Sequence, residues 1–285
     1  DQLIGWSLRE LNPLARRVLG RLTVVIGGFT IDAAEAIARS GGIDDVDIDL
    51  ALEKLEDAGL IVREQTPVGV RHHILEPIRQ HIAAITDLAE IASSADRHAG
   101  WFCELARAVK TGSVGADFGR WADIVEFDMS NFRQAHRLLI ERGDQIGAVT
   151  IIDGLCVVGI ERGLMELADW CDTTVELVSG RHDHLELAAL AAAAQFWWLQ
   201  NRVEEIPPAA ERMSRVDGSA EHHLALELVA VRATLSPERW ADAIERLQRA
   251  LARYGPTEPT WATGQLVVFL VLLGGLDESA AAPIA

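Results

Sequence analysis

The sequence predicts a mainly α-helical protein, with a small N-terminal domain followed by an array of helical repeats. Apolar residues recur at helical spacing along most of the 285 residues, and β-branched residues gather in one pair of short segments, 60–64 and 70–74. A block in the second half, which begins at Ala209, also recurs from Ala243 onward. The chain is long enough for two domains, because domains commonly contain about 100 to 200 residues.

The first 90 residues predict three helices followed by a hairpin. The first helix ends at Gly27-Gly28, which we interpret as a helix stop only. The second spans 32–39 and the third spans 46–58, and each is followed by glycine. Two β-rich segments at about 60–74 flank a turn that contains proline and glycine. This order predicts a winged-helix domain over residues 1–90, with the hairpin as its wing.

The third of these helices has the wrong charge for reading DNA. In DNA-binding proteins of this shape, the corresponding helix enters the major groove, where cationic side chains neutralise phosphates. Here one lysine, Lys54, stands among acidic residues, and the whole chain carries a formal charge of -17. The acidic residues are Asp44, Asp45, Asp47, Asp49, Glu53, Glu56 and Asp57. We therefore expect no direct contact with nucleic acid through this chain.

The remainder of the chain predicts helices throughout. We expect a linking helical bundle over residues 91–180 and helical repeats over residues 181–285, with a third unit that begins near Thr257 and is truncated at the C-terminus. The period of about 34 residues is that of tetratricopeptide repeats, in which helical hairpins stack on one another. The recurring residues are Ala209, Glu211, Arg212 and Arg215, matched by Ala243, Glu245, Arg246 and Arg249.

Cysteine content and hydropathy predict a cytoplasmic protein without a membrane span. Cys103, Cys156 and Cys171 have neither the spacing of a zinc knuckle nor the even number of a disulfide scaffold, so we expect reduced, mostly buried thiols. No segment has the order of a signal peptide. The most apolar window, Leu266–Leu273, is much shorter than the roughly 20 residues that span a bilayer.

No motif in the sequence indicates catalysis or a metal site. A glycine-rich loop ending in lysine and serine or threonine is missing, and no catalytic set is signalled locally. The pairs His72-His73 and His222-His223 lack the spacing and the third ligand of a metal site. We therefore predict histidines that face solvent or cap helices, no metal and no enzymatic activity of the chain itself.

Several segments resemble the winged-helix region of bacterial STAND-type ATPase regulators, which are related to NB-ARC proteins. These segments are 29–35, then 74–80, and the helices that contain 98–106 and 127–133. Together the matching motifs cover about residues 6–145. In that family an ATPase domain precedes the winged helix, and a helical-repeat sensor follows it. The chain starts at Asp1 without a methionine, so we expect it to be a piece of a longer protein whose ATPase domain is absent here.

The resemblance implies a regulatory and sensor role in a bacterial signalling or transcriptional regulator. It implies ATP or ADP with magnesium for the parent protein and no cofactor in this chain. The expected partners are the upstream NTPase domain and a protein or small-molecule effector on the repeat arm, and the oligomeric state stays open. Output domains of this family include LuxR-type DNA-binding modules and adenylate-cyclase domains. The alternative is a DNA-binding winged-helix regulator with a helical dimerisation domain.

The resemblance also marks a position for nucleotide sensing, at Ile74, Leu75 and Glu76. In the wider family a Met-His-Asp triplet stands there, and its histidine is associated with the β-phosphate of ADP. Leu75 occupies the histidine position and cannot donate a hydrogen bond to phosphate. We expect Glu76 to cap the helix that follows, with Pro77 in its first turn.

Two further groups of residues are candidate contact sites. Arg16, Arg17 and Arg21 form a basic cluster on the first helix, which is a candidate contact with the absent ATPase domain. Trp198 and Trp240 are candidates for a partner surface, because aromatic side chains often anchor interfaces. The other six tryptophans are expected mostly in the core.

Overall fold

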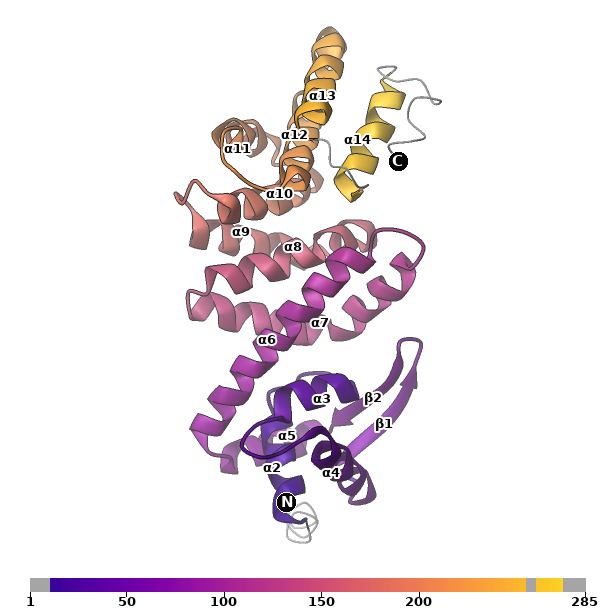
Figure 1. Cartoon of the computed structure of the whole chain (residues 1–285), viewed down its shortest axis with the longest axis vertical. Coiled ribbons are helices and arrows are strands. Elements are labelled where there is room, and N and C mark those ends of the chain that lie inside the picture. Colours follow the sequence, from indigo (N-terminus) through magenta and orange to yellow (C-terminus); the bar gives the residue numbers. More distant parts are fainter. Residues whose placement is uncertain (1–10, 255–259, 274–285) are drawn as a thin grey trace. The chain divides into compact units, whose positions relative to one another are not determined.

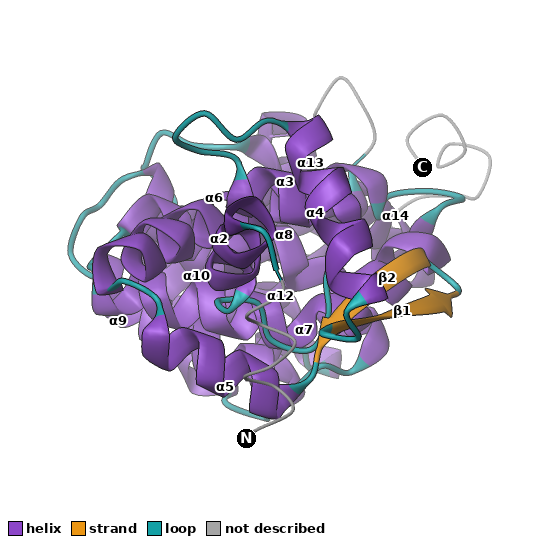
Figure 2. Ribbon diagram, turned by 90° about the horizontal axis from the view of Figure 1, so that it is seen from below, coloured by secondary structure: helices purple, strands orange, loops and turns teal. Residues whose placement is uncertain are grey.

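The computed structural model describes residues 11–254 and 260–273 and confirms a mainly α-helical fold. Figure 2 shows the described residues as helices, with one two-stranded hairpin. Trp6, the predicted start of a third repeat near Thr257, and the truncated end at 274–285 lie outside the described residues. Among the described helices, none has both the length and the apolar character needed to cross a membrane.

Contacts divide the chain into two compact units. Unit 1 contains residues 1–109 and 119–142, and unit 2 contains residues 110–118 and 143–285. The predicted linking bundle of 91–180 is therefore shared between the two units.

Three short helices open unit 1, in the order the sequence predicts. They are α2 (Pro13–Leu22), α3 (Ile31–Ala38) and α4 (Asp45–Asp57). The side chains of Asn12 and Thr30 accept hydrogen bonds from the first turns of α2 and α3. Asp44 and Asp47 form a capping box at the start of α4. Two of the acidic residues that argue against DNA binding therefore also begin this helix.

The hairpin follows α4 directly. Strands β1 (Ile61–Thr66) and β2 (Gly69–Ile74) are antiparallel, with Ile61 opposite Ile74 and Thr66 opposite Gly69. At the turn, the hydroxyl of Thr66 donates to the carbonyl of Gly69, which has a φ of 116°. An isolated β-bridge joins Phe29 to His72, so the loop before α3 lies along β2.

Three more helices follow the hairpin, the short α5 (Glu76–Ile85) and the long α6 (Leu88–Gly112) and α7 (Phe118–Glu141). The expectation that Glu76 caps α5 is wrong. Leu75 is the residue before the first turn, and no side chain caps this helix. Glu76 is the first helical residue and Pro77 the second, where a missing backbone N–H costs no intrahelical bond.

Unit 2 is a series of packed helices. These are α8 (Gln145–Arg162), α9 (Glu166–Val178), α10 (His184–Leu199), α11 (Ile206–Met213), α12 (Ala220–Thr234), α13 (Trp240–Tyr254) and α14 (Trp261–Leu272), with short 3-10 turns at Val203–Glu205 and Pro237–Arg239. Helix α10 packs against α8 and α12, and α12 packs against α14. Alternate helices are therefore neighbours, as in a stack of helical hairpins.

The recurrence in the second half of the sequence has a structural counterpart. Ala209 and Met213 on α11 are buried, and so are the residues that match them on α13, Ala243 and Leu247. In α10 the side chains of residues 191–194, all alanine, are buried and permit close approach of neighbouring helices. The three cysteines are free and buried, as predicted.

Candidate functional site

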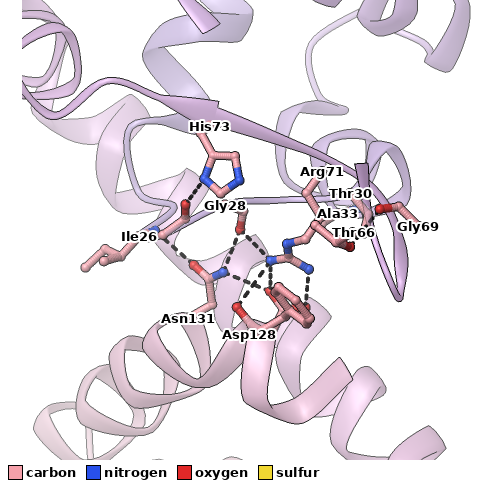
Figure 3. Close-up of polar contacts among 12 residues, drawn as sticks. Ile26, Gly28, Thr30, Ala33, Thr66, Gly69, Arg71, His73, Asp128 and Asn131 are labelled. Carbon is pink, nitrogen blue, oxygen red and sulfur yellow. Dashed lines mark hydrogen bonds and ion pairs between the residues drawn. The ribbon is translucent and has the colours of Figure 1, made fainter. Parts of the chain in front are cut away.

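The best-defined polar site of unit 1 is centred on Arg71 of β2, whose side chain is 2% exposed. Its Nη1 donates to Oδ2 of Asp128 at 2.9 Å, and its Nη2 donates to Oδ1 at 2.6 Å. Nη2 also donates to the carbonyl of Gly28 at 3.0 Å. Figure 3 shows this two-point pairing of strand and helix. Such a geometry fixes the orientation of β2 relative to α7 as well as the distance between them, because the planar guanidinium pairs with both carboxylate oxygens.

Asn131 lies one turn after Asp128 on α7 and completes the site. Its Nδ2 donates to the carbonyl of Gly28 at 2.8 Å and to Oδ1 of Asp128 at 3.0 Å. Its Oδ1 accepts from the backbone N–H of Ile26 at 2.9 Å (Figure 3). Asn131 is therefore bonded to both the loop and the ion pair. We call Gly28, Arg71, Asp128 and Asn131 the hairpin joint.

Gly28 has a role that sequence reasoning missed. A Cβ at this position would lie 2.6 Å from the ring of His73, so a larger residue would require that ring to move away from the loop. The ring nitrogen Nδ1 of His73 contacts the carbonyl of Gly27. Helix α2 ends at Leu22 with Thr23 as its C-cap, so the interpretation of Gly27-Gly28 as a helix stop is wrong. These glycines lie in the loop that bonds to β2 and α7.

The hairpin joint consists of buried polar groups that are already paired with one another. Both charged partners are buried and paired, so the loss of either one would leave an isolated charge in a poorly hydrated place. His98 on α6 approaches Oδ1 of Asn131 with its Nε2 at 3.5 Å. Burial lowers the pKa of His98 to about 4, which keeps the ring neutral near pH 7. The arrangement fixes the hairpin and the loop before α3 to α7 within unit 1.

The predicted nucleotide-sensing triplet follows β2 at the edge of this joint. Leu75 is exposed, and Ile74 and Glu76 line a small recess of about 30 Å³ beside the loop at residues 25–29. Arg79 donates to both carboxylate oxygens of Glu76, at 2.8 and 2.7 Å, and these bonds together with one from Gln80 lower the pKa of Glu76 to about 2. The recess has room for about one water molecule.

The three arginines of the predicted basic cluster do not share one surface. Arg21 is buried, and it donates to the carbonyls of Ala38 and Ser40 and to Glu90. Arg16 and Arg17 are exposed and line an open cleft of about 280 Å³ together with residues of α5 and α6. Arg21 therefore holds the end of α3, and only the other two remain accessible to a partner.

The prediction of solvent-facing or capping histidines is wrong for His72 and His223, which are buried. His72 is buried, with its Nε2 2.8 Å from Glu56 of α4 and its ring stacked on that of Phe29. His223 is buried and stacks on Tyr254, with ring centroids 4.4 Å apart. His222 contacts Asp153 at 2.9 Å. His73 is partly exposed.

Unit 2 contains a second polar cluster, which no local motif signalled. The ammonium of Lys110 donates to both carboxylate oxygens of Asp153, at 3.0 and 2.9 Å, and lies 3.3 Å from Glu221. His222 also contacts this ammonium, at 3.1 Å. Burial raises the pKa of Asp153, but the bonds from His222 and Lys110 outweigh it and leave that pKa at about 2. The cluster joins residues that are up to 112 positions apart in sequence.

The two candidate tryptophans of the partner surface both reach solvent. Trp198 is 41% exposed and Trp240 is 43% exposed, whereas Trp170 and Trp197 are buried. The indole N–H of Trp240 donates to the carbonyl of Leu273 at 2.9 Å. The ring of Trp198 faces the guanidinium of Arg232, with 5.7 Å between the ring centroid and Cζ.

Comparisons with known proteins gave a structural likeness. No family model and no curated protein matches the chain. Among solved structures, it is similar to a Signal Transduction ATPase with Numerous Domains (STAND) protein with a tetratricopeptide repeat sensor, from Pyrococcus horikoshii. The likeness has a TM-score of 0.37 and 16% sequence identity, and it covers 94% of this chain and 48% of that protein. The chain thus spans about half the length of that protein.

Proposed function

We propose that this chain is the regulatory and sensor portion of a STAND-type, ATP-dependent signalling regulator. In this proposal unit 1 is the lever that responds to the nucleotide state of an ATPase domain elsewhere in the protein, and unit 2 is the arm that binds an effector. The sequence motifs shared with that family support the assignment. The chain itself contributes no catalysis, and ATP or ADP with magnesium belongs to the ATPase domain.

The hairpin joint is the observation that carries this proposal. A lever must move as one body, because a flexible connection would absorb a displacement instead of passing it on. The bonds of Arg71, Asp128 and Asn131 connect β2, the loop before α3 and α7, which are distant in sequence. Coupling additionally requires that nucleotide and effector each favour one of two states, which only the whole protein can display.

The first test is the sequence of the natural protein outside residues 1–285. A glycine-rich loop ending in lysine and serine or threonine is expected before Asp1, since such loops hold the phosphates of ATP. If the natural protein has such a domain, Arg71→Lys should change the rate of ADP release while the protein stays folded. Glu104→Ala, which breaks an exposed ion pair with Arg107, is the matched control and should leave that rate unchanged. A natural protein without a nucleotide-binding domain would refute the proposal.

The alternative, a DNA-binding regulator, is opposed by the outward face of α4. Val46, Asp49, Leu50, Glu53 and Asp57 fall at helical spacing on this face, and all five are exposed. Three carboxylates there repel the phosphate backbone. We expect no mobility shift of duplex DNA at physiological salt. A shift that weakens when Lys54 is replaced by glutamine would favour the alternative.

A further inference from the structure

Arg232 at the end of α12 differs from most arginines of the described chain, because no carboxylate among the described residues pairs with it. Its guanidinium instead lies over two aromatic rings, with Cζ at 5.7 Å from the centroid of Trp198 and 5.1 Å from that of Phe269. Its Nη2 donates a long hydrogen bond to the side-chain Oε1 of Gln265, at 3.4 Å. Arginines that do contact a carboxylate include Arg21, Arg39, Arg71, Arg79, Arg107, Arg137, Arg142, Arg181, Arg202, Arg212, Arg246 and Arg249.

This environment leaves the positive charge of Arg232 poorly compensated. The side chain is partly buried, and burial lowers its pKa from the ordinary value. Stacking on aromatic rings offsets some of the lost hydration, since the ring faces are electronegative. It also holds the guanidinium plane in one orientation, while most of its five N–H donors lack an acceptor among the described residues. A guanidinium fixed in this way is prepared to take a planar anion.

An apolar surface of unit 2 adjoins the guanidinium. Gln265, Val268, Phe269 and Leu272 fall at helical spacing on one face of α14, and α14 packs against α12. Val268 is 54% exposed and Leu272 is 72% exposed. The surface therefore continues from Trp198 on α10 over Arg232 on α12 to the end of α14. We call these six residues the arginine face.

We propose that the arginine face binds a peptide segment in which apolar side chains adjoin a carboxylate. The carboxylate would accept two hydrogen bonds from Arg232, and the apolar side chains would cover Trp198, Val268 and Leu272. Charge complementarity selects this occupant, because a cation without a countercharge among the described residues adjoins the apolar surface formed by Trp198 and α14. This inference rests on the proposed function, in that it locates the effector surface of the arm and names its chemistry.

The probe for the test is the tripeptide acetyl-Leu-Phe-Leu, prepared as the free acid and as the C-terminal amide. Calorimetry with residues 1–285 is expected to show that the acid binds at least about tenfold more tightly than the amide, because only the acid forms a charge-assisted pair. Arg232→Gln should bring the ratio of the two affinities close to one. Arg232→Lys should restore part of it, since lysine keeps the charge but loses the two-point geometry.

The matched control is Arg215→Gln, which removes an exposed arginine from the same unit. It should leave the ratio unchanged, which separates local recognition from the general effect of net charge. Arg232→Gln breaks no ion pair among the described residues, so its melting temperature should remain near that of the unaltered chain. Equal affinity for acid and amide, or no binding of either, would refute the proposal. Self-association that Arg232→Gln abolishes, without peptide binding, would assign the face to a second copy and refute it as well.

The measurement uses neither nucleotide nor an ATPase domain. Peptide binding can therefore succeed even if the chain is not part of an ATP-dependent switch. Conversely, a nucleotide-binding domain found in the natural protein would support the proposed function even if the peptide failed to bind.

Discussion

The guanidinium of Arg71 and the carboxylate of Asp128 form a buried two-point ion pair across 57 positions of sequence. The pair joins the last strand of the hairpin to α7, and the carbonyl of Gly28 accepts from the same guanidinium. Because all three elements belong to unit 1, loss of the ion pair between Arg71 and Asp128 should destabilise that unit first.

Asp128→Ala is expected to lower the free energy of unfolding of unit 1 by about 3 to 5 kcal/mol, since it leaves the Arg71 cation buried without a partner. Urea unfolding followed by circular dichroism would measure the change. Glu104→Ala serves as the control, because it breaks an ion pair whose side chains are largely exposed, and it should cost less than about 1 kcal/mol. Similar losses in both variants would contradict the buried pairing.

Gly159→Ala should destabilise unit 2. A Cβ at this position would overlap Cδ1 of Leu167 and lie 3.0 Å from Cζ of Phe196, so neighbouring side chains must move at a cost of about 1 to 3 kcal/mol. Gly100→Ala is the matched control within α6, because a Cβ there meets nothing within 4 Å. It is expected to stabilise the helix by roughly 0.5 to 1 kcal/mol. Thermal unfolding of both variants should give shifts of opposite sign.

The stability of unit 1 should fall in mildly acidic solution because of His98. Its pKa is about 4 in the folded chain against an ordinary value of 6.5, so the unfolded chain takes up a proton first as the pH decreases. The contribution is complete above pH 6.5 and is lost between pH 6.5 and about 4. The loss amounts to about 3 kcal/mol from this residue.

His98→Gln should flatten the decline of unfolding free energy over that pH window. Burial lowers the pKa of His136 to about 4 as well, so part of the slope should persist in the variant. A slope that His98→Gln does not change would show that His98 titrates normally in the folded chain.

The neighbours Trp197 and Trp198 should respond in opposite ways to replacement by alanine. Trp197 is buried and its indole N–H donates to Asp172 at 2.7 Å, so its loss should cost about 3 to 5 kcal/mol. Trp198→Ala should alter stability by less than about 1 kcal/mol but weaken binding at the arginine face. Melting temperatures would separate the two. A large stability loss for Trp198→Ala would show that its ring belongs to the core.

Local rules predicted the order of the helices and the hairpin, but they misplaced the end of α2 and the cap of α5 and did not identify the sites. Asn12, Thr30 and Asp44 cap helices through bonds to residues three positions away, so nearby sequence contains the needed information. The helix-period and β-rich patterns likewise reflect neighbours within a few residues.

Such local rules cannot predict contacts between residues that are distant in sequence. Arg71 and Asp128 become partners only because the hairpin folds onto α7. The residues within a few positions of either one do not indicate this pairing. The burial of His72 was missed for a similar reason. Alternation along a strand assigns His72 and His73 to opposite faces, but it does not show that the His72 side chain lies against Glu56 of α4 and the ring of Phe29.

The Lys110 cluster has a consequence for the order in which the chain folds during synthesis. Lys110 leaves the ribosome well before Asp153 and much earlier still than Glu221 and His222. Its ammonium must remain hydrated until those partners arrive, because burying it alone would be costly. Helices α8 to α10 can associate earlier, whereas the end of α6 becomes fully enclosed only after α12 has emerged. A nascent chain that stops before residue 220 should therefore expose this region to proteases, and one that extends past α12 should protect it.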